Sequence, residues 1–426
     1  CRQPFWKLKW RTPLMLMTRN WLFALLSALL LGGCSWFTWL PWVDGDDDEE
    51  DSLEPASLVK FDAEVNIKRV WKAGVGEGLG RKYLRLNPVV LADRIYAADG
   101  YGRLQAHDRF TGKRLWQAQI ATEGGGFWSG FNFIDRTDTS FVSGGVGAGG
   151  GNVLLGTTDG EVIAFSAADG SERWRGSVGS EVLAPPVVGD DLVFVQSIDG
   201  RLIALEQDSG EIRWSFDNQV PVLTLRGTAE PVFDSGVIYA GFANGTISAL
   251  RAESGEPIWE HRVMLPEGSS ELDRMVDVDS SPLVRGQLIY WVAYQGKVKA
   301  IRRSDGQRVW ELDLSSHLDL GEGYGQIYVV NEKDAVVAID QQSAQEVWRQ
   351  DALYLRRLSS PLAFSNYLAV GDSEGYLHIL AQSDGRFLAR RKLDGDGLRS
   401  GMTYIDGTLY VLGNSGSLHA LEITVR

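Results

Sequence analysis

Cysteine is nearly absent from this chain, which has two Cys among its 426 residues, Cys1 and Cys34. No Cys follows residue 34, so disulfide bonds cannot hold the rest of the chain together. Histidine is also scarce, and the five His residues are scattered without the spacing of metal ligands. Helical periodicity is absent after residue 34 as well. The sequence therefore predicts neither a metal site nor a helical domain.

Basic residues are outnumbered, since 42 Lys and Arg stand against 56 Asp and Glu and give a formal net charge of −14 at pH 7. Nucleic acid is excluded as a partner, because its phosphates require a basic surface. Much of the acidic excess lies in Asp44–Asp51, which precedes the repeats described below and is predicted to be a solvated, self-repelling linker. Glu49 stands where a calcium loop requires Gly, so no metal is expected there.

What the chain has in abundance is a repeated phrase, clearest between Pro186 and Trp214. There, two apolar strands, Leu192–Val195 and Leu202–Leu205, flank the turn Asp199–Gly200 and precede the closing Trp. The closing Trp recurs at seven positions, Trp71, Trp116, Trp174, Trp214, Trp259, Trp310 and Trp348, and Ala389 stands in the eighth. Steps of about 40 to 50 residues with four short strands indicate propeller blades, which bury their faces only by stacking around an axis. We predict an all-β fold, an eight-bladed β-propeller with four-stranded antiparallel blades, in which each Trp indole locks two blades together.

The two ends of the chain are predicted to complete one blade together. The last repeat, Gly401–Leu421, stops where a fourth strand should follow, whereas Val65–Trp71 carries the terminal Trp without three strands before it. The N-terminal strand is therefore expected to close the last blade, which removes exposed sheet edges. On this basis the propeller occupies residues 65–426.

Residues 17–34 have the features of an export signal. A short basic region is followed by the apolar run Trp21–Leu31, too short to span a bilayer, and then by Leu31-Gly-Gly-Cys34. These four residues resemble the bacterial lipobox, in which the Cys is lipidated and the preceding peptide is removed. We expect an upstream extension and signal peptide at 1–33, lipidation at Cys34, and a lipidated N-terminus with an acidic linker at 34–64. By resemblance to lipoprotein sorting rules, Ser35 favours the outer membrane, with the protein facing the periplasm.

Two strings that match catalytic motifs are predicted to belong to the blades. Gly371-Asp-Ser-Glu-Gly375 matches a nucleophile elbow, but it lies between two strands with no helix after it, so it is predicted to be a turn. Gly145–Gly150 matches a dinucleotide fingerprint, but a strand follows it, and Gly144–Gly151 is predicted to be a flexible insertion. The sequence therefore offers no catalytic residue.

The phrase Thr111–Trp116, preceded by Leu104–Asp108, resembles the repeat of dehydrogenases that depend on pyrroloquinoline quinone. Their propellers also have eight blades joined through docked Trp residues, and the resemblance covers nearly everything after residue 65. It concerns blade construction, because the calcium site, catalytic carboxylate and adjacent Cys residues of those enzymes cannot be placed in this sequence. We expect no cofactor, and the competing classes are a periplasmic quinoprotein dehydrogenase and a generic periplasmic ligand-binding propeller.

The combination of lipobox, linker, eight quinoprotein-like blades and a strand shared between the termini resembles more closely the BamB family, lipoproteins of the outer-membrane β-barrel assembly machinery. The resemblance implies a scaffold, not an enzyme, that binds BamA through its POTRA domains and assists the assembly and insertion of β-barrel proteins. Unfolded outer-membrane proteins are further partners that it implies.

Two connections between blades carry the candidate binding site. Ser215–Glu230 and Glu260–Ser281 are longer than other connections such as Arg175–Pro185, and successive connections of one kind are expected side by side on one face. By resemblance to the family's Leu-x-Leu-Arg and Asp-x-Asp residues, we assign to BamA binding Leu223, Leu225, Arg226, Asp277 and Asp279. The alternative is that the two Leu residues pack the loop onto the propeller, and that the Asp pair caps it through Arg274 or Arg226.

Overall fold

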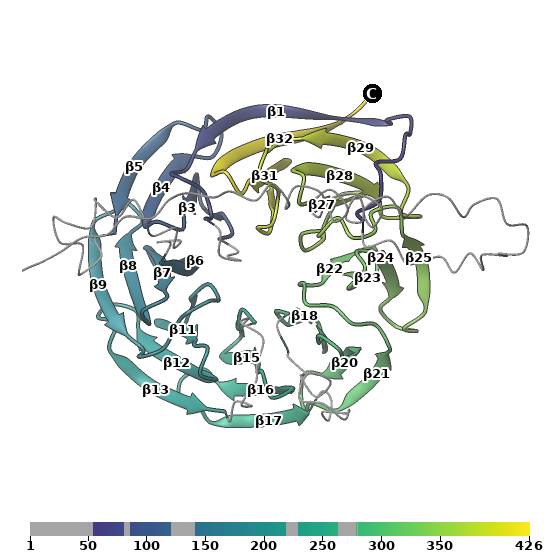
Figure 1. Cartoon of the computed structure of the whole chain (residues 1–426). Helices are drawn as coiled ribbons and strands as arrows, with labels where there is room; N and C mark the ends of the chain where they lie inside the picture. The colour runs from purple at the N-terminus through teal and green to yellow at the C-terminus, as the bar shows by residue number, and fades with distance from the viewer. Residues whose placement is uncertain (1–53, 81–85, 121–140, 219–228, 263–277, 279) are drawn as a thin grey trace, which may run out of the picture. The chain divides into compact units, whose positions relative to one another are not determined.

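The computed structural model describes residues 54–80, 86–120, 141–218, 229–262, 278 and 280–426. Within these residues the chain forms eight four-stranded antiparallel sheets that stand in a ring (Figure 1). The predicted eight-bladed β-propeller is therefore confirmed. No helix in this described part is long and apolar enough to cross a membrane.

The strands of each blade are lettered A to D from the axis outward. Blade 1 contains β2 (Val89–Leu91), β3 (Arg94–Ala98), β4 (Arg103–Asp108) and β5 (Arg114–Gln119). Blade 2 contains β6 (Val142–Gly149), β7 (Asn152–Thr157), β8 (Glu161–Ser166) and β9 (Glu172–Ser177). Blade 3 contains β10 (Val187–Gly189), β11 (Leu192–Gln196), β12 (Arg201–Glu206) and β13 (Ile212–Asp217). Blade 4 contains β14 (Val232–Asp234), β15 (Val237–Gly241), β16 (Thr246–Arg251) and β17 (Pro257–Arg262).

The second half of the ring repeats this order. Blade 5 contains β18 (Leu283–Arg285), β19 (Leu288–Val292), β20 (Val298–Arg302) and β21 (Arg308–Leu312). Blade 6 contains β22 (Gly321–Gly323), β23 (Gln326–Val330), β24 (Val336–Asp340) and β25 (Glu346–Gln350). Blade 7 contains β26 (Leu362–Phe364), β27 (Tyr367–Gly371), β28 (Tyr376–Ala381) and β29 (Phe387–Lys392). Blade 8 contains β30 (Thr403–Ile405), β31 (Thr408–Leu412), β32 (Ser417–Val425) and β1 (Val65–Gly74).

The N-terminal strand closes the ring as predicted. Strand β1 pairs antiparallel with β32, from Val65 opposite Val425 to Gly74 opposite Ser417. It is the outermost strand of blade 8, and Figure 1 shows it in purple along the outside of the yellow C-terminal strand. The first and last strands of the propeller therefore hold each other in one sheet, which leaves no gap between the ends of the ring.

The hydrophobic core lies between neighbouring blades. All five residues of β11 are buried, because its sheet is covered on both faces by the next blades. The outer strand β13 instead shows exposed residues at every second position or more, since one edge of that strand faces solvent. Stacking of the apolar sheet faces is what binds the repeats into one ring.

Each of the seven repeat Trp residues locks its blade to the next, as predicted. Its indole Nε1 donates a hydrogen bond to a carbonyl oxygen in the C–D turn of the following blade, at 2.7 to 3.2 Å. The carbonyls belong in ring order to Arg109, Ala167, Gln207, Ala252, Arg303, Gln341 and Gln382. A buried indole N–H needs such a partner, so the lock supplies hydrogen bonding together with apolar contact.

The eighth slot is occupied by Ala389, and the closure of the ring explains why. Ala389 lies opposite Ile379 in blade 7, in the register that Trp214 has with Ala204 in blade 3. A Trp at this position would need the C–D turn of blade 8. That turn does not exist, because strands C and D of blade 8 come from opposite ends of the chain. The lock is missing where its acceptor is missing.

The prediction of a flexible insertion at Gly144–Gly151 is wrong. Most of this segment belongs to β6, the innermost strand of blade 2, and most of β6 is buried. A Cβ atom at Gly147 would lie 2.0 Å from the carbonyl oxygen of Pro186, and one at Gly144 would lie 2.6 Å from that of Ala184. Glycine is required here because the backbone of the next blade approaches too closely for any side chain.

The blades define two faces that position the candidate site. The A–B face carries the A–B and C–D turns, whereas the D–A face carries the B–C turns and the connections from one blade to the next. The segment Gly371–Gly375 is a B–C turn between β27 and β28, as predicted. Both long connections that carry the candidate residues run from a D strand to the next A strand, so they belong to the D–A face.

Candidate partner-binding face

The predicted site residues lie outside the described part of the chain. This holds for the lipidation residue Cys34 and for the binding residues Leu223, Leu225, Arg226, Asp277 and Asp279. Their assignment therefore stays a prediction. What the structure does describe is how the two connections that carry the binding residues begin and end on the propeller.

The two long connections join adjacent pairs of blades. The first leaves β13 at Asp217 and enters β14 at Val232, and the second leaves β17 at Arg262 and enters β18 at Leu283. Blade 4 thus receives the first connection and sends out the second. Their described ends share the D–A face, which is the geometry that a composite binding surface requires.

The first connection is fastened where it leaves blade 3. The Asn218 side chain donates from Nδ2 to Thr246 Oγ1 at 2.8 Å and accepts from Asn244 Nδ2 at 2.5 Å. Asn244 and Thr246 belong to the B–C turn region of blade 4. The departing chain is therefore tied to the blade that it will enter, which fixes the direction in which the connection starts.

The second connection returns through a residue buried in the core. Val278, which stands between Asp277 and Asp279 in the sequence, is 1% exposed and packs with Tyr239 and Trp291 between blades 4 and 5. Ser280 then donates from Oγ to the carbonyl oxygen of Val292 at 2.7 Å. The middle residue of the predicted Asp-x-Asp motif is thus an anchor, and burial of a Val side chain contributes about 1.5 to 3 kcal/mol.

Two acidic residues that the sequence analysis did not select lie at the base of these connections. Asp319 accepts a hydrogen bond at Oδ1 from the backbone N–H of Ser281, at 2.7 Å, where the second connection ends. Glu230 ends the first connection and is partly exposed as a residue, but burial of its carboxyl group and the nearby charge of Asp319 raise its pKa to about 8. Burial therefore favours the neutral, protonated form of the Glu230 carboxyl group.

A sequence signal for this pair existed in the repeat. Glu230, Ser281, Asp319 and Ser360 all stand two residues before an A strand. Aligning the repeats at that position would have placed these polar residues next to one another around the axis. The raised pKa of Glu230 would still have been missed, because it depends on contacts between blades that only the folded ring creates.

One buried cluster in blade 8 has the composition of a catalytic triad but not its order. Ser417 Oγ donates to a carboxylate oxygen of Asp394 and lies 3.2 Å from Nε2 of His419. In a triad the His stands between the acid and the nucleophile and accepts the hydroxyl proton. Here the Ser proton is held by the acid, and all three residues are buried. The cluster braces β32 and is not built for nucleophilic attack.

The described residues also contain no group of three or more His, Cys, Asp or Glu side chains arranged to hold a metal ion. The fold and the paired connections together define a class: an eight-bladed propeller of quinoprotein-like repeats with a candidate protein-binding face. A family model described as outer membrane protein assembly factor BamB matches residues 101–350 and 323–424. The chain belongs to the BamB family.

Individual relatives agree with this assignment. An outer membrane protein assembly factor BamB of Pseudomonas aeruginosa is 40% identical over 406 residues, which cover 95% of this chain and 99% of that protein. The crystal structure of BamB from Moraxella catarrhalis matches with a TM-score of 0.73 at 27% identity and covers 84% of this chain and 100% of that one.

The dehydrogenase resemblance extends to the fold alone. The quinohemoprotein alcohol dehydrogenase of Comamonas testosteroni matches with a TM-score of 0.67 but at 14% identity, over 83% of this chain and 76% of that one. At this identity the blades are comparable and the active-site residues are not. The relatives that are similar in sequence point to an assembly factor and not to an enzyme.

Proposed function

We propose that this protein is a non-enzymatic scaffold of the outer-membrane β-barrel assembly complex. In this proposal, it is anchored by lipid at Cys34 to the periplasmic side of the outer membrane. It binds the POTRA domains of BamA and assists the assembly and insertion of β-barrel proteins, with unfolded outer-membrane proteins as further partners. Membership of the BamB family supports the proposal.

The observation that carries the proposal is the rooting of two long connections on one face of adjacent blades. Val278 and the Asn218 side chain fix described parts of these connections to the propeller. A rigid frame lowers the entropy that a binding loop loses when a partner is bound, so a loop held at its base is well suited to recognition. Leu223, Leu225 and Arg226 would supply an apolar anchor beside a forked cation, which is a common composition of interface centres.

Co-purification of BamA with the membrane-extracted protein tests this proposal. Leu225→Ala or Arg226→Ala should weaken BamA binding by about 1 to 4 kcal/mol if each is a hot spot. Because both residues lie outside the described blade strands, the propeller's thermal unfolding should change little. Asp277→Asn and Asp279→Asn should also weaken binding if the carboxylates contact BamA or hold the loop.

Matched controls are available elsewhere on the ring. Leu115 is an exposed apolar residue on the outer strand β5. Arg302 is the last residue of β20 and forms an exposed ion pair with Asp305. Leu115→Ala and Arg302→Ala should leave BamA binding intact. Normal binding by the Leu225 and Arg226 variants would refute the assigned interface. Stoichiometric pyrroloquinoline quinone in the purified protein would instead favour the dehydrogenase alternative.

A further inference from the structure

The segment Glu54–Glu64, here called the strap, precedes β1 and packs on the outside of blade 7. It was predicted to be the end of a linker. In Figure 1 it is the purple chain that leaves the start of β1 and turns back over blade 7. Its contacts run from the A–B face at Glu64 to the D–A face at Ala56, along the outer strand β29.

The N-terminal end of the strap is held by the connection between blades 6 and 7. The backbone N–H of Ala56 donates to the carbonyl oxygen of Tyr354 at 2.9 Å. The carbonyl oxygen of Ala56 accepts from Nη1 of Arg356, also at 2.9 Å. Both hydrogen bonds go to backbone atoms of the strap, and both partner residues belong to a connection on the D–A face.

The middle of the strap is held by β29. Nη1 of Arg390 donates to the carbonyl oxygen of Val59 at 3.0 Å. Phe61 stacks on Phe387 with ring centroids 5.4 Å apart, and the Arg390 guanidinium carbon lies 5.1 Å from the centroid of each ring. The strap therefore places one aromatic side chain in a position where a cation and a second ring both contact it.

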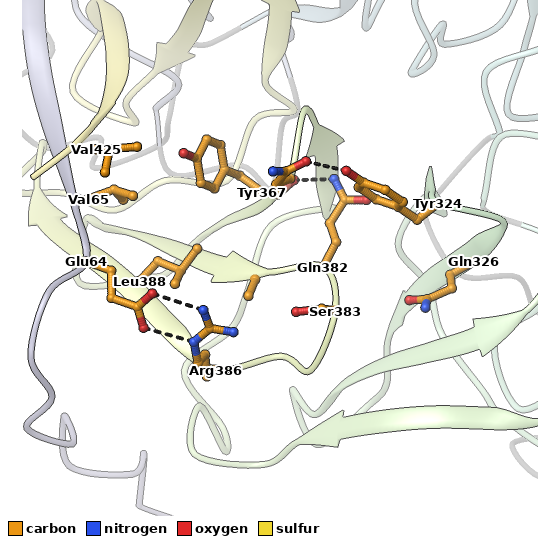
Figure 2. Close-up of a pocket in the computed structure, with 12 residues that line it drawn as sticks. Glu64, Val65, Tyr324, Gln326, Tyr367, Gln382, Ser383, Arg386, Leu388 and Val425 are labelled. Carbon is orange, nitrogen blue, oxygen red and sulfur yellow. Dashed lines mark hydrogen bonds and ion pairs between the residues drawn. The ribbon is translucent and has the colours of Figure 1, made fainter.

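The C-terminal end of the strap is held by a forked ion pair. Nε and Nη2 of Arg386 donate to the two carboxylate oxygens of Glu64 at 2.9 and 3.0 Å, as Figure 2 shows. The backbone N–H of Glu64 donates to the carbonyl oxygen of Leu388 at 2.9 Å. Beside this pair a surface groove of about 680 Å³, lined also by Tyr324 and Gln382, remains open on the A–B face.

A buried charge network positions Arg356 and Arg390, the two arginines that donate hydrogen bonds to the strap backbone. Nε of Arg356 donates to Asp372 Oδ2 at 2.8 Å, and its Nη2 lies 2.8 Å from both Asp372 and Glu374 carboxylate oxygens, as ion pairs and not as aligned hydrogen bonds. Nε2 of His378 lies 2.9 Å from Asp372, and Nε of Arg390 donates to His378 Nδ1 at 3.1 Å. Since Nδ1 accepts, a neutral His378 carries its proton on Nε2 and donates it to Asp372.

We propose that the outer edge of blade 7 is a docking site whose occupant is the strap, and that docking fixes the N-terminal end of the strap at the D–A face. The recognition is specific in chemical class: it takes an extended segment with an aromatic residue three positions before a carboxylate. The buried side chains of Arg356, Asp372 and His378 do not serve the stacking of the ring alone, because the network ends on two carbonyl oxygens of the strap.

The consequence concerns the length of the tether, which is the chain between Cys34 and the strap, and this part rests on the proposed function. The D–A face carries both the N-terminal end of the strap, beside blades 6 and 7, and the described ends of the long connections between blades 3 and 5. From Cys34 to Glu54 the chain can extend over about 70 Å at most, at about 3.5 Å per residue. A docked strap would not increase this maximum length, whereas a released strap would increase it by about one half.

The docking itself is tested on the purified full-length protein without lipid or BamA, so its failure is distinguishable from failure of the proposed function. Lys60 is exposed and lies between Val59 and Phe61, the two residues by which β29 holds the middle of the strap, so trypsin cleavage after Lys60 reports release. Arg390→Gln removes a charge-assisted hydrogen bond and the cation over both rings, and we expect cleavage to accelerate at least about 10-fold. Phe61→Ala, which changes only the strap, should accelerate cleavage in the same direction.

Arg349→Gln is the matched control, because Arg349 forms an ion pair with Glu346 on the outer strand β25 and does not contact the strap. Its cleavage rate should equal that of the unmodified protein. Thermal unfolding of each variant shows whether the ring remains folded, and Phe61→Ala decides the question if Arg390→Gln does not fold. Unchanged cleavage in Phe61→Ala, or equal acceleration in Arg349→Gln, would overturn the docking site.

Discussion

The Trp locks predict an asymmetric response to two glycine substitutions with nearly the same backbone. Gly210 has φ +73° and lies in the C–D turn of blade 3, where a Cβ atom would be 2.4 Å from Cε3 of Trp174. Gly325 has φ +70° and lies in the A–B turn of blade 6, with nothing within 4 Å of its Cβ position. The comparison of Gly210→Ala with Gly325→Ala therefore isolates the contact with the indole.

The magnitude follows from the two contributions. Both variants place Ala in the left-handed region, which costs about 1 to 2 kcal/mol, and both gain about 0.4 to 1 kcal/mol through reduced freedom of the unfolded chain. Only Gly210→Ala also forces the buried Trp174 away from its acceptor, the carbonyl oxygen of Gln207 at 2.7 Å. Overpacking of this kind costs about 1 to 3 kcal/mol, so Gly210→Ala should be less stable than Gly325→Ala by that amount.

Urea-induced unfolding, followed by Trp fluorescence and circular dichroism, measures the difference. One blade already has Ala at the position that corresponds to Gly210. This residue is Ala344, which has φ 59° and stands opposite Trp310. Trp310 is only partly buried and can yield, whereas Trp174 is buried, so Ala344→Gly should change stability little. Equal destabilisation by Gly210→Ala and Gly325→Ala would refute the argument that the indole is held tightly between blades.

Two further predictions concern acid and the membrane. Burial, followed by the charge of Lys72, lowers the pKa of the fully buried His419 to about 4. The neutral form therefore stabilises the fold above pH 6.5, by about 3 kcal/mol at roughly 1.4 kcal/mol per pKa unit. That contribution should be lost as pH falls from 6.5 toward 4, and urea titrations should show a shallower loss in His419→Gln; an unchanged pH dependence would contradict this role. Cys34→Ser should move the folded protein from the membrane to the soluble fraction, and mass analysis that finds an unmodified N-terminus at another residue would contradict lipidation.

The architecture was predictable because it depends on local patterns that recur. Pairs of apolar strands around a turn such as Asp199–Gly200, and a closing Trp, specify a blade whatever its neighbours are. The shared last blade was predictable too, because Val65–Trp71 lacks its own inner strands. The Gly-rich strand β6 was not, since the need for Gly147 comes from the carbonyl oxygen of Pro186 in the next blade. A pattern of residue types carries no information about that approach.

The candidate site was predictable only by resemblance and by loop length. The sequence placed the long connections correctly between D and A strands, and the described ends of both connections lie on the D–A face. The anchoring of Val278 and the acid pair of Glu230 and Asp319 required the folded ring, because each depends on residues from another blade. The five assigned binding residues themselves remain predictions.

Closure of the ring links three features that seem unrelated in the sequence. Because β1 and β32 come from opposite ends of the chain, blade 8 has no C–D turn, and so blade 7 has no acceptor for a Trp and carries Ala389 instead. The strap, which directly precedes β1, passes blade 7, where Arg386, Leu388 and Arg390 hold it. The strap therefore ties blade 7 to the start of the closing strand at the one junction that lacks an indole lock. A propeller closed in this way can make the attachment of its N-terminal segment part of its closure.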